Sequence, residues 1–106
     1  MSSGKKTGAT SELDISSYDR PPHAREFMRM WSDDGGGAIC FVDPSALGAD
    51  PFLYGIAIVD AIRHGANAYA QAVNITPEKA FDRIMEGFSA EMEHPTDTPK
   101  QVNRPQ

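Results

Sequence analysis

Apolar residues recur at spacings of three and four through residues 50–73, DPFLYGIAIVDAIRHGANAYAQAV, and this pattern predicts one long helix. Asp50 suits the N-cap, because its carboxylate can accept from first-turn amides, and Pro51 suits the first helical position. We expect the segments on either side to cover the apolar residues. These form one row of Phe52, Ile56, Val59, Ile62, Ala66, Tyr69 and Val73, widened by Tyr54, Ile58, Ala61, Gly65 and Ala68.

The polar residues of this helix fall on one narrow line and supply the candidate site: Asp60, His64, Asn67 and Gln71. Their spacing is i, i+4, i+7 and i+11, so Asp60 could orient or charge His64. The simplest interpretation is a solvated face with an ion pair worth about 0.3–0.5 kcal/mol. A ligand-binding groove or subunit contact is the interpretation we carry forward. Acid–base catalysis is disfavoured, because no second catalytic group lies at a recognisable spacing.

Two short apolar segments ahead of the helix predict a β-hairpin. The expected strands are residues 26–32 (EFMRMWS) and 38–42 (AICFV), joined by DDGGG, where glycine allows positive φ. The expected facing pairs are Ser32–Ala38, Trp31–Ile39, Met30–Cys40 and Arg29–Phe41. Both faces of this hairpin are apolar, yet only one can pack on the helix. Something else must therefore cover the second face.

A second helix is predicted to begin after Thr76, a hydroxyl N-cap that precedes Pro77, and to end at His94. Its apolar stripe consists of Phe81, Ile84, Met85, Phe88 and Met92. The expected fold is therefore α+β, a β-hairpin followed by two antiparallel helices (ββαα), with room for a short N-terminal extended segment at Leu13, Ile15 and Tyr18.

Composition divides the chain into one folded domain and two polar ends. We expect a mostly disordered arm over residues 1–24, a single domain over 25–95 and a flexible tail over 96–106. A folded part of this size is marginally stable alone, so a partner subunit is expected. The single cysteine excludes an internal disulfide and fits a cytoplasmic protein, and no segment has the length or apolar character of a membrane span or signal peptide.

Charge narrows the possible partners. The net charge is −5, and residues 33–97 carry eleven acidic side chains against three basic ones. Because nucleic acid and anionic membrane surfaces are bound by clusters of Lys and Arg, both are disfavoured as partners.

Other residues with reactive side chains have simpler explanations. The glycines at 35–37 lack the lysine of a phosphate-binding loop and follow two carboxylates, so a turn explains them. Cys40 lies between two large apolar residues, typical of a buried thiol. Zinc would require His23, His64 and His94 to converge from separate segments. We therefore predict no cofactor, no metal site and no catalytic residue.

Several segments together resemble a known family: FMRMW, the glycine-rich turn, DPFLYGIAIVDAIRHGANAYA, AFDRIMEGFSAEM and HPTDTP. The chain is similar over residues 25–99 to a small family of alpha-proteobacterial proteins catalogued only as a domain of unknown function. The resemblance implies a bacterial origin and the same hairpin and helices, but no activity, cofactor or site. The family usually carries Trp before the helix glycine, where this chain has Tyr54.

The predicted function is that of an interaction or regulatory module acting as a homodimer. One alternative is a small-molecule binding protein that uses the face of Asp60, His64 and Asn67. Another is an enzyme that uses His64, although we favour a non-enzymatic role.

Overall fold

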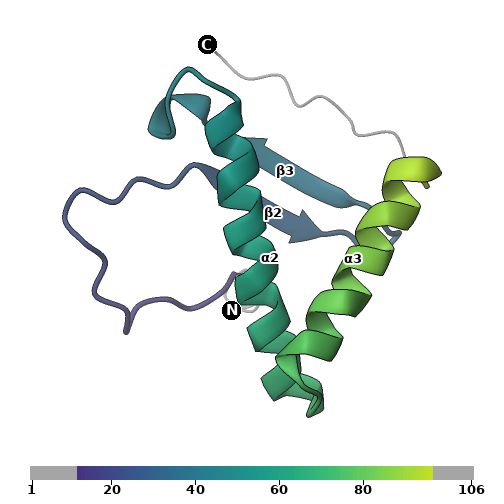
Figure 1. The fold of residues 1–106 in the computed structure, drawn as a ribbon. Coiled ribbons are helices and arrows are strands. Elements are labelled where there is room, and N and C mark those ends of the chain that lie inside the picture. The colour runs from purple at the N-terminus through teal and green to yellow at the C-terminus, as the bar shows by residue number, and fades with distance from the viewer. Residues whose placement is uncertain (1–11, 97–106) are drawn as a thin grey trace, which may run out of the picture.

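The computed structural model describes residues 12–96 and shows a hairpin followed by two helices (Figure 1). The elements are β2 (Met28–Ser32), β3 (Ala38–Val42), a short 3-10 turn η1 (Pro44–Ala46), α2 (Phe52–Val73) and α3 (Pro77–Glu93). The predicted α+β architecture of ββαα order is confirmed. No helix within residues 12–96 is both long and apolar enough to cross a membrane.

The hairpin has the predicted antiparallel register. Met30 faces Cys40, Trp31 faces Ile39, and the remaining predicted pairs follow. The turn places Gly36 and Gly37 at φ 92° and 82°, values that glycine adopts without steric cost. Strand β2 begins two residues later than predicted, since the last pair of the ladder is Met28 with Val42. Just beyond it, the Asp43 amide donates to the Phe27 carbonyl at 2.7 Å.

Short-range contacts fix both ends of the helix pair. The Asp50 carboxylate accepts from the Phe52 amide at 3.1 Å, but Asp50 is not the N-cap as predicted, because the helix begins at Phe52 and Pro51 occupies the N-cap position. Asn74 ends α2 in the left-handed conformation at φ 59°, which asparagine tolerates better than most residues. The Thr76 hydroxyl then accepts from the Lys79 amide at 3.1 Å and caps α3. The predicted cap and the following Pro77 are thus confirmed.

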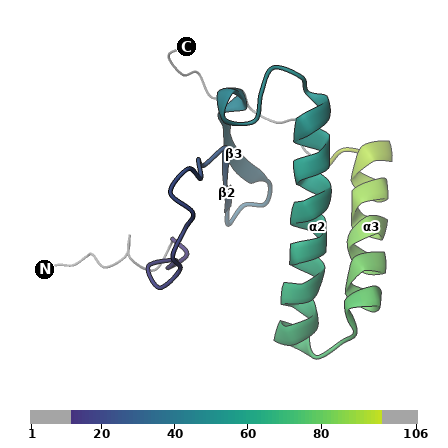
Figure 2. The same ribbon diagram turned by 60° about the vertical axis from the view of Figure 1, so that its left-hand side comes forward.

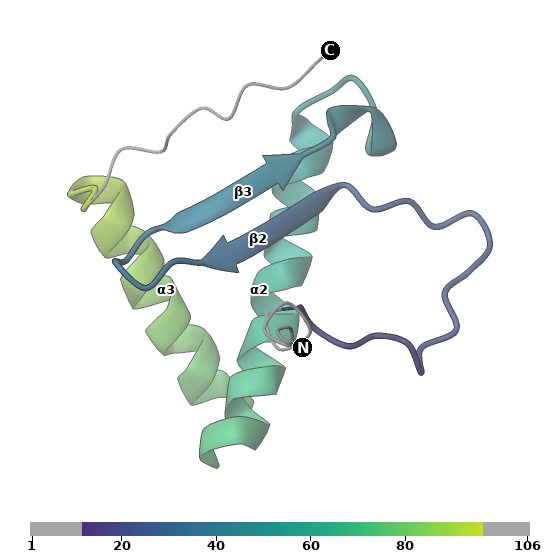
Figure 3. The ribbon, with the colours of Figure 1, turned by 180° about the vertical axis from the view of Figure 1, so that it is seen from behind.

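Helices α2 and α3 meet where the chain connects them and diverge toward the start of α2 and the end of α3 (Figure 1, Figure 3). At the meeting end Ala66 and Ala80 are only 3% and 2% exposed, and they are the only buried apolar residues among those described. Gly65 also lies there, and a Cβ added to it would contact Ile84 at 4.0 Å. Small side chains let two helix backbones approach closely, so this end of the pair is the packed centre of the structure.

The hairpin lies on one side of the helix pair (Figure 2, Figure 3). Its contacts with α2 run through Tyr54, whose ring meets Phe27 edge to face at 6.4 Å between centroids. The Tyr54 hydroxyl also lies 3.5 Å from the Met28 sulfur and can donate a weak hydrogen bond to it. Extensive backbone packing within the described chain joins β2 to β3 and α2 to α3, but not the hairpin to the helices.

The segment before the hairpin covers little of it. Leu13 and Ile15 line a shallow hollow beside Met28 and Met30, yet Leu13, Ile15 and Tyr18 are themselves largely exposed. Arg25 joins this segment to η1 by donating to the Ser45 hydroxyl at 3.3 Å. The predicted disorder of both ends falls largely on residues 1–11 and 97–106, which lie outside the described part of the chain.

Candidate functional site

The predicted polar row lies along one side of α2, and all four of its side chains are exposed: Asp60, His64, Asn67 and Gln71. Helical geometry alone brings them together. No hydrogen bond or ion pair joins Asp60 to His64 within the described residues. A role for this row in binding a ligand or a subunit stays a prediction.

One member of the row borders a groove between the helices. Asn67 lines it together with Glu78 and Asp82, and the Arg63 guanidinium lies over the Phe81 ring at 5.6 Å from its centroid. This groove combines one cation with two carboxylates. It therefore presents mixed charge and does not select strongly for ligands of either sign.

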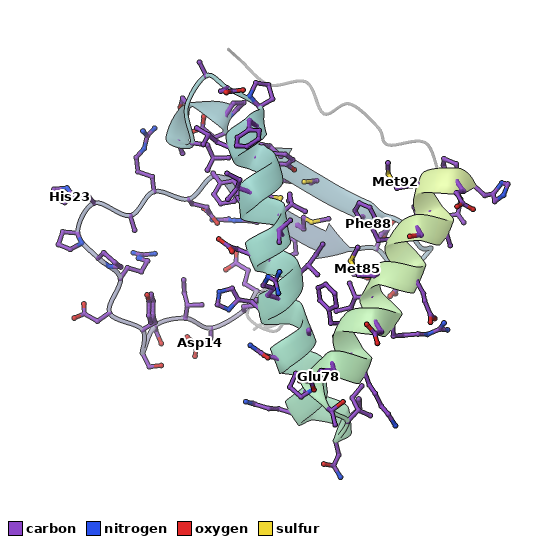
Figure 4. The ribbon with its side chains drawn as sticks, in the orientation of Figure 1. Asp14, His23, Glu78, Met85, Phe88 and Met92 are labelled. Carbon is purple, nitrogen blue, oxygen red and sulfur yellow. The ribbon has the colours of Figure 1, made fainter. Side chains whose placement is uncertain are left out.

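The other residues with reactive side chains do not form a site in this structure. Cys40 is half-buried in β3 opposite Met30. Within residues 12–96, no group of three or more His, Cys, Asp and Glu side chains gathers closely enough to hold a metal ion. His23 lies on the segment before the hairpin, away from both helices (Figure 4).

Two exposed carboxylates have perturbed ionisation. A hydrogen bond and ion pair with Arg29, at 2.6 Å, hold the pKa of Glu26 below its ordinary value of 4.5 and raise the pKa of Arg29. Hydrogen bonds from the Ser16 side chain and amide hold the pKa of Asp14 below its ordinary 3.8. Both carboxylates face water, so these shifts reflect local pairing on the surface and do not mark a catalytic site.

The most prominent feature of the surface is an apolar face on the helix pair that the sequence assigned to the interior. Phe52, Ile56 and Val59 expose 70%, 50% and 46% of their surface. Phe52 and Ile56 each lie two residues, or roughly 200°, from Tyr54, so they point away from the hairpin. The expectation that this part of the row is covered is wrong for the chain alone.

The second helix continues this face. Phe88 and Met92 expose 44% and 71% of their surface, and Figure 4 shows both on the side of α3 that faces α2 across the diverging end. Arg63 lies four residues after Val59 and therefore on the same side of α2. Phe88 lies seven residues, about two turns, after Phe81 and therefore on the same side of α3. The contact between Arg63 and Phe81 links the two lines near the connected end of the pair, and we treat them as one surface. We call it the open helix face, formed by Phe52, Ile56, Val59, Phe88 and Met92.

A smaller apolar surface lies on the hairpin. Ile39 and Phe41 alternate with the residues that face α2, and both remain partly exposed. With Trp31 they form the side of the sheet turned away from the helices. The sequence predicted that something other than the helix covers this second face, but the described residues before the hairpin leave Ile39 and Phe41 partly exposed.

Comparison with known proteins identifies the family but no activity. A structure described as "Structure of a putative pyruvate dehydrogenase from the photosynthetic bacterium Rhodopseudomonas palustrus CGA009" is 32% identical, with a TM-score of 0.60, and the match covers 90% of this chain and 91% of that one. A search of the curated proteins finds no match. A family model, described as a domain of unknown function, matches residues 16–96. The chain therefore belongs to the DUF5076 family, the domain of unknown function that this model describes.

Proposed function

We propose that the chain is a small interaction or regulatory module that works as a homodimer. One observation carries the proposal: two alanines are the only buried apolar residues of the described chain, whereas fifteen large apolar side chains are exposed. Burial of apolar surface is the main favourable term in folding, and two alanines supply very little of it. A partner that covers the exposed side chains would therefore add to the stability of the native state.

The proposal includes the organisation and setting of the chain. The folded unit of this proposal is residues 25–95, and residues 1–11 and 97–106 lie outside the described part of the chain. A bacterial source is supported by the similar structure, which comes from a photosynthetic bacterium, and the single cysteine supports a cytoplasmic setting. The acidic charge of the folded unit favours a protein partner over nucleic acid or an anionic membrane.

Sedimentation velocity of the full chain over a micromolar concentration series tests the proposal. We expect a dimer that dissociates only on dilution. Circular dichroism recorded on the same samples reports whether the helices persist. A monomer that retains full helicity and cooperative thermal unfolding would contradict the proposal.

The alternative is a small-molecule binding protein, and one observation favours it. Asn67 of the predicted polar row lines the groove that also holds Arg63 and Glu78. A thermal-shift screen of the full chain against metabolites separates this role from the module, since a ligand that binds only the folded state raises its stability. The signal should disappear in Asn67→Ala if the groove is the site.

No observation on the described residues favours a reaction. An enzyme needs groups whose protonation is tuned by their surroundings, and no polar side chain among residues 12–96 is buried. The activity named for the similar structure is therefore not proposed for this chain.

A further inference from the structure

We infer that the open helix face is the surface on which a second copy of this chain docks, with the same face of each copy in contact. The inference rests on the proposed homodimer and names its interface. In such a dimer the four helices form the middle layers and the two hairpins lie outside.

The size of the face fits this role. Its five residues expose between 44% and 71% of their surface. At roughly 150–250 Å² for a large side chain, this amounts to on the order of 500 Å² of apolar surface per copy. A standard interface buries roughly 800 Å² per partner, of which about 56–65% is apolar. The open helix face therefore supplies about the apolar surface of one half of such an interface.

The chemistry of the face favours a second copy over an unrelated protein. Two charged side chains of α2 lie at this face, Asp60, four residues after Ile56, and Arg63, which lies over the Phe81 ring. Obligate homodimer interfaces are the apolar ones, whereas transient interfaces carry more polar groups. An apolar face can also meet its own copy without placing like charges opposite each other, which matters for a folded unit as acidic as this one.

Folding gives a further reason. Ala66 and Ala80 are the only buried apolar residues among those described, so a partner that is present when the chain folds would stabilise it further. Copies of the same chain meet that condition wherever the chain is made.

Matched charge substitutions on the two apolar surfaces test the interface. Ile56→Arg places a charge in the open helix face, and Ile39→Arg places the same charge on the outer side of the hairpin. Sedimentation equilibrium should show a dissociation constant at least 100-fold higher for Ile56→Arg and nearly unchanged for Ile39→Arg. If Ile39→Arg alone dissociates, the homodimer stands but the hairpin is its interface. A monomeric wild type overturns both the homodimer and this interface.

Cross-linking keeps the test decisive if Ile56→Arg fails to fold. In a Cys40→Ser background, Ile56→Cys should give a covalent dimer with a short bismaleimide. Ala72→Cys in the same background is the control, because Ala72 is exposed but lies on the other side of the helix from Ile56. It is five full turns after Tyr54 and therefore on the same side of α2 as Tyr54. Equal yields from both variants, or none from Ile56→Cys, would overturn the inference.

Discussion

The two ends of the helix pair differ in side-chain size, and this difference separates what the chain completes alone from what it leaves open. At the connected end, Gly65, Ala66 and Ala80 allow the helices to meet, and the two alanines are buried. At the diverging end, Phe52 and Met92 are large and mostly exposed. The distance between two packed helices depends on the size of the side chains at the contact. Small residues therefore let α2 and α3 pack closely at one end, whereas the large residues at the other end are left for a partner to cover.

The largest expected effect is at the closed end. Ala66→Leu should lower the free energy of unfolding by about 1–3 kcal/mol, because Ala66 is only 3% exposed and the added atoms must displace neighbouring side chains between the helices. Chemical denaturation monitored by circular dichroism measures this change. Ala68→Leu is the matched control, since Ala68 is exposed two residues further along the same helix. Equal stabilities for the two variants would show that the helices are not tightly packed there.

At the open end the effect should appear in association. Phe52→Ala should raise the dissociation constant of the dimer about tenfold, equivalent to about 1.4 kcal/mol, because aromatic side chains often dominate interface energies. Sedimentation equilibrium provides the measurement. Leu13→Ala, at the most exposed large apolar residue of the described chain, should leave the constant unchanged. If Phe52→Ala behaves like Leu13→Ala, Phe52 does not contribute to the interface.

The connection between the helices should be sensitive to its cap. Thr76→Ala removes the hydroxyl that accepts from the Lys79 amide and should cost about 1 kcal/mol. Thr76→Ser retains the acceptor and should restore most of the loss. Denaturation midpoints measure both variants. An undiminished stability in Thr76→Ala would mean that the cap is not needed to close this end.

The polar row should give the smallest effect. His64→Ala should change the free energy of unfolding by no more than about 0.5 kcal/mol, since His64 is exposed and no hydrogen bond to Asp60 holds it within the described chain. A double-mutant cycle with Asp60→Asn measures their coupling. A coupling energy well above about 0.5 kcal/mol would show that the row is covered in the assembled protein.

Elements that depend on nearby residues could be predicted from the sequence. The hairpin register, the Thr76 cap and the end of α2 near Asn74 each follow from residues within a few positions of one another. The predicted starts of β2 and α2 were early by two residues at most, because ladder and helix bonds begin only after the first extended or capping residues.

The buried side of α2 could not be predicted, because it depends on packing over long range. The helix is apolar around most of its circumference, and one predicted row contained both Ala66, which is buried, and Phe52, which is open. Periodicity cannot distinguish them. The clustering of Gly65 and Ala66 was the available signal, since small residues mark close approach of helices. For the candidate site, the sequence placed the polar row on one side of α2 but could not reveal whether any partner contacts it.

An intercopy distance tests the central claim most directly. With Cys40→Ser and Ala38→Cys, a spin label lies on the exposed start of β3, and pulsed electron paramagnetic resonance reports the separation of two labels in the dimer. Docking through the open helix face leaves two layers of helices between the two hairpins. Three layer spacings of roughly 10 Å then separate the labels, so we expect a label-to-label distance on the order of 30 Å. A separation below roughly 15 Å, the spacing of hairpins in direct contact, would contradict the account.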